Sequence, residues 1–566
     1  VAADRSWTRS CSVIFCEPFW ALSLFCENFA GEKNRDIFIA HGNLKISFKF
    51  EEQLVTMPCS KIYCVTVVGA VVAVAGAIFA LFWGDIFDAV IVKEKSLTPT
   101  SKAFKLWKRP PFQAQWQMTL FNCTNAVDFL ENRARRPKVV EVGPYAFTES
   151  SEKIEVRFNT KNSTVSFRKR TMFAWDEDQS QALTDEPITN LNMVALAATN
   201  RGRHSGYTMQ RGISFTLFSF GQKVFVTKTA AELLFDGYPE PMIKGLEDVM
   251  SFIGEDMGLD GRFSWFHTLN GTKKAYGYFN MDTGSDDSSQ YGLVRAWNYR
   301  TQSANADGTA CGKYQGFTGE LFPTKIRKDR VLRIFTPEAC RVLTFEFEQE
   351  VDVYGVRAFR FVGTARTVDN GSAYPAETGC YTAGGDSFPT GVMNLTECRM
   401  GAPAFASFPH FYLADPFYRG QVEGMRPDRE RHQSFFVVEP ISGIVLNATI
   451  AIQINALLRP SSNVALYQDS PTAYVPMIWF SKRFQLAEED VLKLKAQLQV
   501  SELGYFGGFA VAAVGALIAL ASVVMGLIFK NTLRRQQKER PATLVVPSKD
   551  PRGDYQPVEG QDKIKV

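Results

Sequence analysis

The chain has 566 residues, of which 45% are hydrophobic and 13% aromatic, and its formal net charge is +4. This apolar content is enough to bury a large core. The excess charge sits at the C-terminal end, because residues 530–566 hold nine Lys or Arg against five Asp or Glu. The rest of the chain is neutral overall, which gives no support to nucleic-acid binding, and we expect no nucleic-acid partner.

Residues 1–56 are expected to be translated upstream sequence or an artefact of the gene model, and otherwise a cytoplasmic extension of unknown purpose. The segment opens without a methionine and has no convincing periodicity, whereas Met57 stands shortly before a long apolar run. Residues 57–64 are then a short cytoplasmic N-terminus. Within it, Cys59 and Cys64 are candidates for S-palmitoylation, with ordinary reduced thiols as the alternative.

Two apolar runs, residues 65–83 and 505–529, predict membrane-spanning helices. Neither contains a charge, and the nineteen residues of the first can cross a hydrocarbon core about 30 Å thick. A buried core helix would carry a polar face, which neither run shows. A cleaved signal peptide is the alternative for the first run, but its core is usually shorter. Small residues suited to helix packing recur in both spans: Gly69, Gly76, Gly507, Gly508 and Gly515.

Charge and glycosylation signals predict the orientation. Basic residues follow the second span, which places the tail at residues 530–566 in the cytoplasm and returns the N-terminus there as well. We therefore expect a multi-pass plasma-membrane protein, or one of the lysosomal or endosomal membrane, with a glycosylated ectodomain at residues 84–504. All Asn-x-Ser/Thr acceptors lie in that ectodomain: Asn122, Asn162, Asn270, Asn370, Asn394 and Asn447.

The first half of the ectodomain predicts a mixture of helices and strands. Residues 101–108 have the pattern of a short amphipathic helix. Residues 138–147 and 164–175 are rich in β-branched and aromatic side chains and predict strands. From residue 188 to 235 the pattern is helical.

The second half predicts mainly strands. Residues 344–348 and 357–361 alternate Phe with charged side chains, and Tyr354-Gly355 suits a turn between them. Residues 450–455 alternate Ile with Ala, Gln and Asn, which predicts one buried and one wet face. Residues 486–503 predict a helix that leads into the second span. The predicted fold class is α+β, with a mostly antiparallel β core and one helical cluster.

Five cysteines lie between the spans. In an oxidising compartment the last four can form two disulfide bridges, which leaves Cys123 without a partner. The chain has no CxxC pair and no His at zinc-ligand spacing, so we expect neither a metal nor a cofactor. The candidate half-cystines are Cys311, Cys340, Cys380 and Cys398.

Six short strings, in order between Val142 and Trp479, resemble the class B scavenger receptors, and the resemblance extends from Met57 to about Phe529. This family includes the fatty-acid translocase, the high-density-lipoprotein receptor, the lysosomal integral membrane protein and the insect sensory neuron membrane proteins. The matching strings are Val142-Gly143-Pro144-Tyr145, Ala231-Glu232-Leu233-Leu234 with Gly237-Tyr238, Asn280-Met281-Asp282-Thr283-Gly284, Ser407-Phe408-Pro409-His410-Phe411, Glu439-Pro440-Ile441-Ser442-Gly443 and Val475-Pro476-Met477-Ile478-Trp479.

The resemblance implies a fold and a mechanism. The ectodomain would be an antiparallel β-barrel-like core that holds a hydrophobic tunnel, capped by a membrane-distal helical bundle. Lipid would be captured at the bundle and would travel along the tunnel to the bilayer. The family's pairing implies disulfides Cys311–Cys380 and Cys340–Cys398 with Cys123 unpaired. The third disulfide of the mammalian members has no counterpart in this chain.

The sequence departs from the family at the position of its ligand-contacting lysine pair. An ungapped count places Ser219 and Gly221 there. Other cations can still make the apex basic, and a solvated mixed surface is the alternative. The expected ligand-binding apex consists of Arg201, Arg203, Arg211, Lys223 and Lys228.

We therefore expect a receptor, not an enzyme, that binds lipids, lipoproteins or other anionic hydrophobic ligands and passes hydrophobic cargo to the membrane. The alternative is a two-span trimeric ion channel with a large ectodomain. An ectoenzyme has little support, because the chain contains neither a GxSxG nor an HExxH string. His410 is expected to be a hydrogen-bonded structural residue.

The tail contains two short signals for protein partners. Tyr555 and Val558 have the spacing of an endocytic sorting signal, which an adaptor protein would read. The C-terminal Val566 suits a PDZ domain, which binds such an end as an added strand. A solvated, disordered tail is the alternative for both.

Overall fold

The computed structural model describes residues 53–181, 186–252, 260–272, 276–303, 312–374, 388–539, 548–549 and 555–556. The chain divides into two units, one formed by Asp88–Leu498 and one by the segments on either side of it. The predicted leader lies almost wholly outside the described residues, as do Cys311, Cys380, Val558 and Val566.

The two longest helices come first and last among the described helices, and the shorter ones belong to the sheet unit. They are α2 (Gln53–Lys95), α3 (Lys102–Lys108), α4 (Ala126–Leu130), α5 (Met193–Arg201), α6 (Tyr207–Ser219), α7 (Pro241–Phe252), α8 (Pro416–Gly420), α9 (Arg429–His432) and α10 (Glu488–Lys538). Short 3₁₀ or π turns are η1 (Glu232–Asp236), η2 (His267–Leu269), η3 (Ser288–Gln290), η4 (Ala365–Val368), η7 (Glu397–Arg399), η8 (Pro409–Phe411) and η9 (Ala465–Tyr467).

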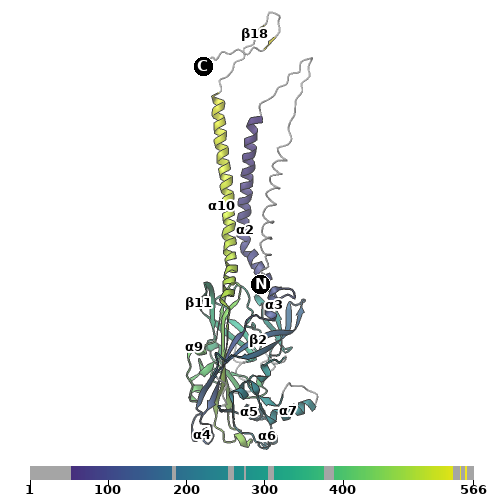
Figure 1. Ribbon diagram of the computed structural model, residues 1–566, viewed down its shortest axis with the longest axis vertical. Coiled ribbons are helices and arrows are strands. Elements are labelled where there is room, and N and C mark those ends of the chain that lie inside the picture. The colour runs from purple at the N-terminus through teal and green to yellow at the C-terminus, as the bar shows by residue number, and fades with distance from the viewer. Residues whose placement is uncertain are drawn as a thin grey trace. The chain divides into compact units, whose positions relative to one another are not determined.

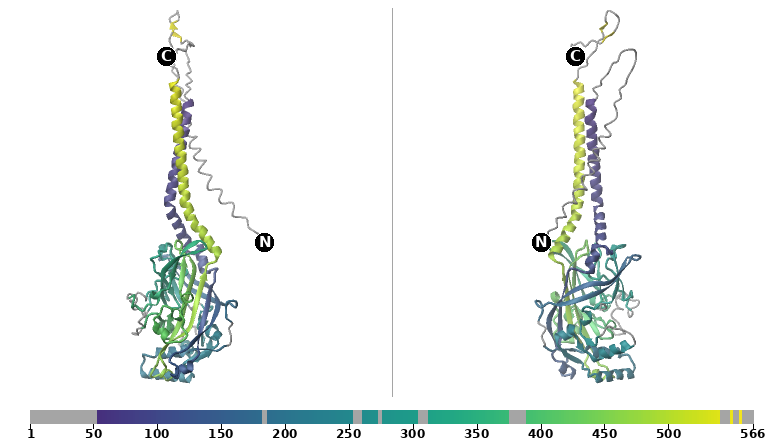
Figure 2. Two further views of the ribbon diagram at one scale, coloured as in Figure 1. Left: turned by 90° about the vertical axis from the view of Figure 1, so that its left-hand side faces the viewer. Right: turned by 45° about the vertical axis from the view of Figure 1, so that its right-hand side comes forward.

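The terminal unit contains most of α2 and α10, which run side by side in all views (Figures 1 and 2). A Cβ on Gly69 would come within 2.7 Å of the backbone nitrogen of Ala519, and one on Gly515 within 2.4 Å of that of Ala73. Only glycine permits this approach of the two backbones. The expected packing role of the glycines is confirmed here, whereas Gly507 has no neighbour within 4 Å.

The sheet unit is built from long antiparallel strands. They are β1 (Ala114–Cys123), β2 (Val139–Asn159), β3 (Thr164–Trp175), β4 (Ile188–Leu191), β5 (Phe225–Lys228), β6 (Tyr238–Pro239), β7 (Arg262–Phe263), β8 (Tyr278–Asp282), β9 (Val294–Trp297), β10 (Leu332–Thr336), β11 (Arg341–Val353), β12 (Val356–Val362), β13 (Met393–Asn394), β14 (Ala404–Ser407), β15 (Phe435–Val438), β16 (Val445–Leu458) and β17 (Ala473–Gln485). In the tail, β18 (Ser548–Lys549) pairs with β19 (Tyr555–Gln556).

The main sheet runs in the order β10-β11-β12-β15-β16-β17-β1-β2-β3-β8-β9. Its two edges meet at Phe317: the Phe317 N–H donates to the Arg333 carbonyl at 2.7 Å, and the Phe335 N–H donates to the Phe317 carbonyl at 2.8 Å. On the other side, the Val294 N–H donates to the Gly316 carbonyl at 2.9 Å. The sheet is therefore nearly closed into a barrel, which confirms the predicted antiparallel barrel-like core.

Most of the predicted elements are present. The amphipathic helix at residues 101–108 is α3, and the two early strand predictions fall in β2 and β3. β11 and β12 form the predicted hairpin, with Val353 opposite Val356 across the turn. The helix predicted from residue 486 begins at Glu488 as α10.

The region from residue 188 to 235 is only partly helical. It contains α5 and α6, but its ends form β4 and β5, which pair with Ile188 opposite Lys228. The β-branched side chains at these ends favour the paired strands, and the helices fill the connection between them. α5, α6 and α7 lie together at one end of the sheet unit (Figure 1).

The prediction of a wet face on β16 is wrong. Ala451, Gln453 and Asn455, the residues between the isoleucines, are all fully buried. The Asn455 side-chain amide donates to the Ser407 hydroxyl at 3.0 Å, and the Gln453 side-chain carbonyl accepts from the His410 N–H at 2.8 Å. β14 and the segment after it cover this face, and their hydrogen bonds satisfy its amides.

One of the two expected disulfides lies within the described residues. It joins Cys340 to Cys398, whose Cα atoms are 6.2 Å apart. Cys123 is free and buried, and burial raises the pKa of its thiol to about 11. A thiol with so high a pKa is inert at neutral pH.

Candidate ligand cavity

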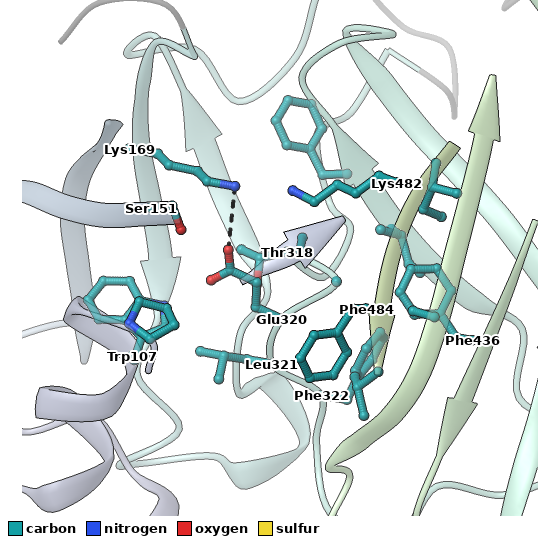
Figure 3. A pocket seen from close by; sticks show the side chains of 18 of the residues that line it. Trp107, Ser151, Lys169, Thr318, Glu320, Leu321, Phe322, Phe436, Lys482 and Phe484 are labelled. Carbon is teal, nitrogen blue, oxygen red and sulfur yellow. Dashed lines mark ion pairs between the residues drawn. The ribbon is translucent and has the colours of Figure 1, made fainter. Parts of the chain in front are cut away.

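A cavity of about 430 Å³ lies inside the sheet unit, within the size range of small-molecule sites. Successive strand residues point to opposite faces, so alternate residues of β16 and β17 face the cavity. Figure 3 shows part of the lining. The lining is mainly aromatic and aliphatic and includes Trp107, Trp116, Phe322, Phe436, Ile450, Ile452, Phe480 and Phe484.

A buried carboxylate, Glu149 on β2, forms the centre of a charged cluster in this apolar lining. Its Oε2 lies 2.5 Å from Lys482 Nζ and accepts a hydrogen bond from Trp116 Nε1 at 2.5 Å. Its Oε1 lies 3.1 Å from Lys169 Nζ. The register of the strands brings these side chains together. Trp116 on β1 is opposite Lys482 on β17, and β1 lies between β17 and β2, the strand of Glu149.

A second carboxylate, Glu320, completes the cluster. It comes from a loop, and its Oε2 lies 2.5 Å from Nζ of Lys153, whose side chain is 1% exposed. Its Oε1 lies 3.7 Å from Nζ of Lys169, the pair that Figure 3 marks. Lys153 and Lys169 are direct partners in the β2–β3 ladder, so their side chains emerge side by side.

The charges of the lysines and glutamates in this cluster shift one another's pKa values. Burial alone would raise the pKa of Glu149, but Lys169 and Lys482 outweigh it and hold the pKa well below its usual range. Burial opposes the charged form of Lys169 too, yet Glu149 and Glu320 raise its pKa well above the ordinary value. Burial lowers the pKa of Lys153, which attraction to Glu320 offsets only in part.

Sequence reasoning did not single out this cluster. Lys482 stands between Phe480 and Phe484 on one face of β17, after nine consecutive buried residues. A cation at an apolar period-two position is a signal of a buried charge, because lysine is rarely placed there without a partner. The strand pattern alone does not identify that partner.

The residues of the expected basic apex lie in and around α5 and α6. Arg201 ends α5 and is exposed, as are Arg211 on α6 and Lys223 just after it. Arg203 donates to the Pro460 carbonyl at 3.1 Å. Lys228 lies 4.0 Å from Glu232 and over the ring of Tyr238.

Exposed aromatic side chains accompany these cations on α6. Phe215 and Phe218 are 71% and 82% exposed. Large apolar side chains so exposed are typical of contact surfaces. The helix therefore presents aromatic and basic groups together.

The six glycosylation acceptors differ in exposure. Asn162 and Asn270 are exposed, whereas the other four are half-buried. The Asn370 amide nitrogen, where a glycan would attach, donates to the Phe388 carbonyl at 2.8 Å.

We expect glycans at Asn162 and Asn270 and none at Asn370, because attachment there would break an internal hydrogen bond. Asn162→Gln and Asn270→Gln should each increase gel mobility by one glycan, and Asn370→Gln should not. Glycosidase-treated samples are the control, since all variants must then co-migrate. A mobility shift in Asn370→Gln alone would contradict the prediction.

The candidate modification and sorting residues lie in the terminal segments. Cys59 and Cys64 are both in α2, and the Cys64 thiol is free. Tyr555 is opposite Lys549 in the β18–β19 pair. Palmitoylation and sorting remain predictions.

His410 is part of a buried hydrogen-bonded group, as expected. Its Nε2 lies 2.8 Å from Glu141 Oε1, and its Nδ1 accepts from the Arg426 N–H at 2.9 Å. Its ring stacks on that of His432, with centroids 4.6 Å apart. Trp479 Nε1 also donates to Glu141. These contacts give His410 a structural role.

An apolar cavity inside a barrel-like sheet, in a chain with two apolar terminal helices, is the architecture of a membrane protein with a hollow ectodomain. The chain belongs to the CD36 family, whose model matches residues 67–526. This result confirms the resemblance to class B scavenger receptors.

Three relatives illustrate the range of the family. Protein peste of Drosophila melanogaster is 34% identical over 407 residues, 72% of this chain and 72% of that protein. Scavenger receptor class B member 1 of Sus scrofa is 26% identical and covers 81% of this chain and 87% of its own. Lysosome membrane protein 2 of Homo sapiens is 28% identical, and the match covers 78% of this chain and 88% of that protein.

Proposed function

We propose that this protein is a cell-surface scavenger-type receptor that binds lipids or lipoproteins and passes hydrophobic cargo through its internal cavity to the membrane. The observation that carries the proposal is the aromatic-lined cavity in a chain of the CD36 family. An apolar lining lets an acyl or sterol group leave water at a gain of about 25 cal/mol per Å² of buried surface. The name of the relative in Sus scrofa, a scavenger receptor, agrees with this role.

Capture is proposed to occur at α5 and α6. The exposed Phe215 and Phe218 would contact the apolar part of a ligand, and Arg201 and Arg211 its anionic part. Arg203, Lys223 and Lys228 would add to the basic surface, with Lys228 weakened by its pairing with Glu232.

The topology and partners are proposed from the sequence. The basic tail and the sequons support a plasma-membrane protein with both termini in the cytoplasm, and the lysosomal or endosomal membrane is the alternative. Tyr555 with Val558 would bind an endocytic adaptor, and Val566 a PDZ domain.

Filling the cavity should reduce lipid uptake. Ala448 lines the cavity and is 7% exposed, so Ala448→Phe adds a ring to the cavity space. We expect uptake of labelled cholesteryl ester or fatty acid by transfected cells to fall at least several-fold with unchanged surface expression. Val140→Phe, at a position that is 47% exposed, is the matched control and should leave uptake unchanged.

Whole-cell current recordings on the same cells test the ion-channel alternative. A ligand-independent or ligand-gated current without labelled-lipid uptake would overturn the proposed function. Equal uptake by wild type and Ala448→Phe would remove the cavity from the transport route.

A further inference from the structure

We propose that the loop between α4 and β2, residues 131–138, is a binding site for a sulfated polysaccharide. None of the residues of this basic loop lines the internal cavity, and the site goes beyond the lipid function proposed above. The loop concentrates four cations within six residues. They are Arg133, Arg135, Arg136 and Lys138.

One of these four cations is already neutralised. Arg133 pairs with Asp128 at 2.7 Å and with Glu131. The other three are exposed and form no ion pair within the residues that the structure describes. Glu423, which pairs with Lys138 in an isolated bridge, offsets at most one of their charges. The basic loop therefore keeps an excess of positive charge that an anion from outside the chain can balance.

The backbone of the basic loop is held in place by the segments around it. The Asn125 side-chain amide donates to the Arg136 carbonyl at 2.9 Å, and its side-chain carbonyl accepts from the Lys138 N–H at 2.7 Å. The Glu423 N–H donates to the Pro137 carbonyl at 2.9 Å. A loop that is already ordered loses little backbone freedom when a ligand binds.

The end of the basic loop presents its cations along a line. Pro137 and Val139 are buried, whereas Arg136 and Lys138 are exposed, which is the alternation of an extended segment. Arg136 and Lys138 therefore lie on one side, with Cα atoms about 7 Å apart. Arg135, next to Arg136, is exposed as well. A linear polymer with an anion on successive units can contact all three cations together.

The chemistry of the basic loop favours a polysaccharide over an amphiphile. Every exposed side chain in residues 131–138 is polar, so the loop has no apolar surface for an acyl chain. On α6, by contrast, Phe215 and Phe218 are exposed beside the cations. The loop also has no aromatic ring on which the bases of a nucleic acid could stack. Planar guanidinium groups bind sulfate through two parallel hydrogen bonds, which suits a sulfated sugar.

An anionic lipid surface is the competing partner, and the position of the basic loop argues against it. The loop follows α4, which lies at the end of the sheet unit opposite to the start of α10 (Figure 1). The chain leaves the sheet unit for the second apolar run through α10. The loop is therefore remote from the point at which the chain leaves the sheet unit.

The test is binding of fluorescent heparin to the full-length chain in nanodiscs of phosphatidylcholine. We expect wild type to bind heparin and to lose affinity as salt rises from about 50 to 200 mM, because binding releases counterions. The triple variant Arg135→Gln, Arg136→Gln, Lys138→Gln should bind roughly tenfold or more weakly at low salt, with a flatter salt dependence.

A matched control removes the same charge elsewhere on the sheet unit. The triple variant Lys102→Gln, Lys105→Gln, Lys161→Gln changes three exposed cations outside the basic loop and should bind heparin as wild type does. The double variant Arg135→Lys, Arg136→Lys keeps the charge without the planar fork, and it should weaken binding only a few-fold.

Two further probes identify the anion. Hyaluronan has carboxylates but no sulfate, and vesicles that contain phosphatidylserine present an anionic lipid surface. We expect heparin to bind more tightly than either. Equal binding of hyaluronan would overturn the assignment to a sulfated polymer, and tighter loop-dependent binding to the vesicles would assign the loop to a lipid surface instead. Heparin binding that the loop variant leaves unchanged, or that the control variant weakens equally, would also overturn the proposal.

Discussion

Glu149→Gln is expected to reduce the free energy of unfolding by about 3 kcal/mol, because removal of one partner from a buried ion pair leaves the other charge unpaired. The Glu149 side chain is 3% exposed and contacts two lysines and an indole N–H. Gln keeps an acceptor for Trp116 but supplies no charge for Lys169 or Lys482. The expected result is a clearly lower midpoint of unfolding.

The measurement is thermal or denaturant unfolding of the full-length chain in detergent, followed by tryptophan fluorescence. Glu155→Gln provides a matched control on the same strand, since Glu155 is 50% exposed and pairs with Arg168 at 3.0 Å. Exposed pairs contribute roughly 0–1 kcal/mol, so this variant should unfold close to wild type. Similar shifts for the two variants would show that the cluster contributes no more than a surface pair.

Much of the fold follows from local sequence patterns. The alternation of Phe with charged residues predicts β11 and β12 because a strand exposes alternate side chains to opposite faces. The two apolar runs predict α2 and α10 for a similar reason, since an all-apolar helix has no polar face to place in water. Both features depend only on residues close in the chain.

The wrong prediction for β16 concerns the segments that pack against this strand. On β16 the alternation of Ile with Ala, Gln and Asn is real, and the isoleucines Ile450 and Ile452 do face the cavity. Gln453 and Asn455 are nevertheless buried, because β14 and the segment after it supply their hydrogen-bond partners. A local pattern identifies two faces of a strand but not the segments that pack on them.

The charged cluster could not be predicted for a related reason. Glu149, Lys169 and Lys482 lie on three different strands, and they meet only through the register of four neighbouring strands. Glu320 enters from a loop, for which the sequence gives no register at all. The position of a strand residue along its neighbour is set by long-range pairing.

The pair of stacked histidines predicts a loss of stability in acid. His432 is fully buried, and its Nδ1 accepts from the Asp428 N–H at 2.9 Å. Burial, together with the nearby charges of His410 and Arg431, lowers its pKa from 6.5 to about 4, and attraction to Glu141 and Asp428 does not compensate. The folded protein therefore keeps this imidazole neutral at pH values at which the unfolded chain protonates it.

The direction of this pH dependence of stability follows from proton linkage. Between about pH 6.5 and pH 4 the unfolded chain binds more protons than the folded protein, so stability falls as pH is lowered through this window. The neighbouring Glu141 has a pKa lowered to about 2 from 4.5, because the hydrogen bond and charge of His410 outweigh burial, and its loss of stability begins only below about pH 4.5. A variant without the imidazole therefore isolates the contribution of His432 in this window.

We expect His432→Asn to flatten the pH dependence of unfolding between pH 6.5 and pH 4.5, where wild type should lose on the order of 2 kcal/mol. Asn retains an acceptor for the Asp428 N–H but cannot be protonated in this range, so the comparison removes the titration and keeps the hydrogen bond. Thermal unfolding at half-unit pH steps gives the slope for each protein.

His204→Asn, at an exposed position outside the cluster, should retain the wild-type slope. If His432→Asn loses stability in acid as steeply as His204→Asn, the buried imidazole is not the acid-sensitive group. A flattened slope would mean that a single buried side chain accounts for most of the loss of stability between neutral pH and pH 4.5.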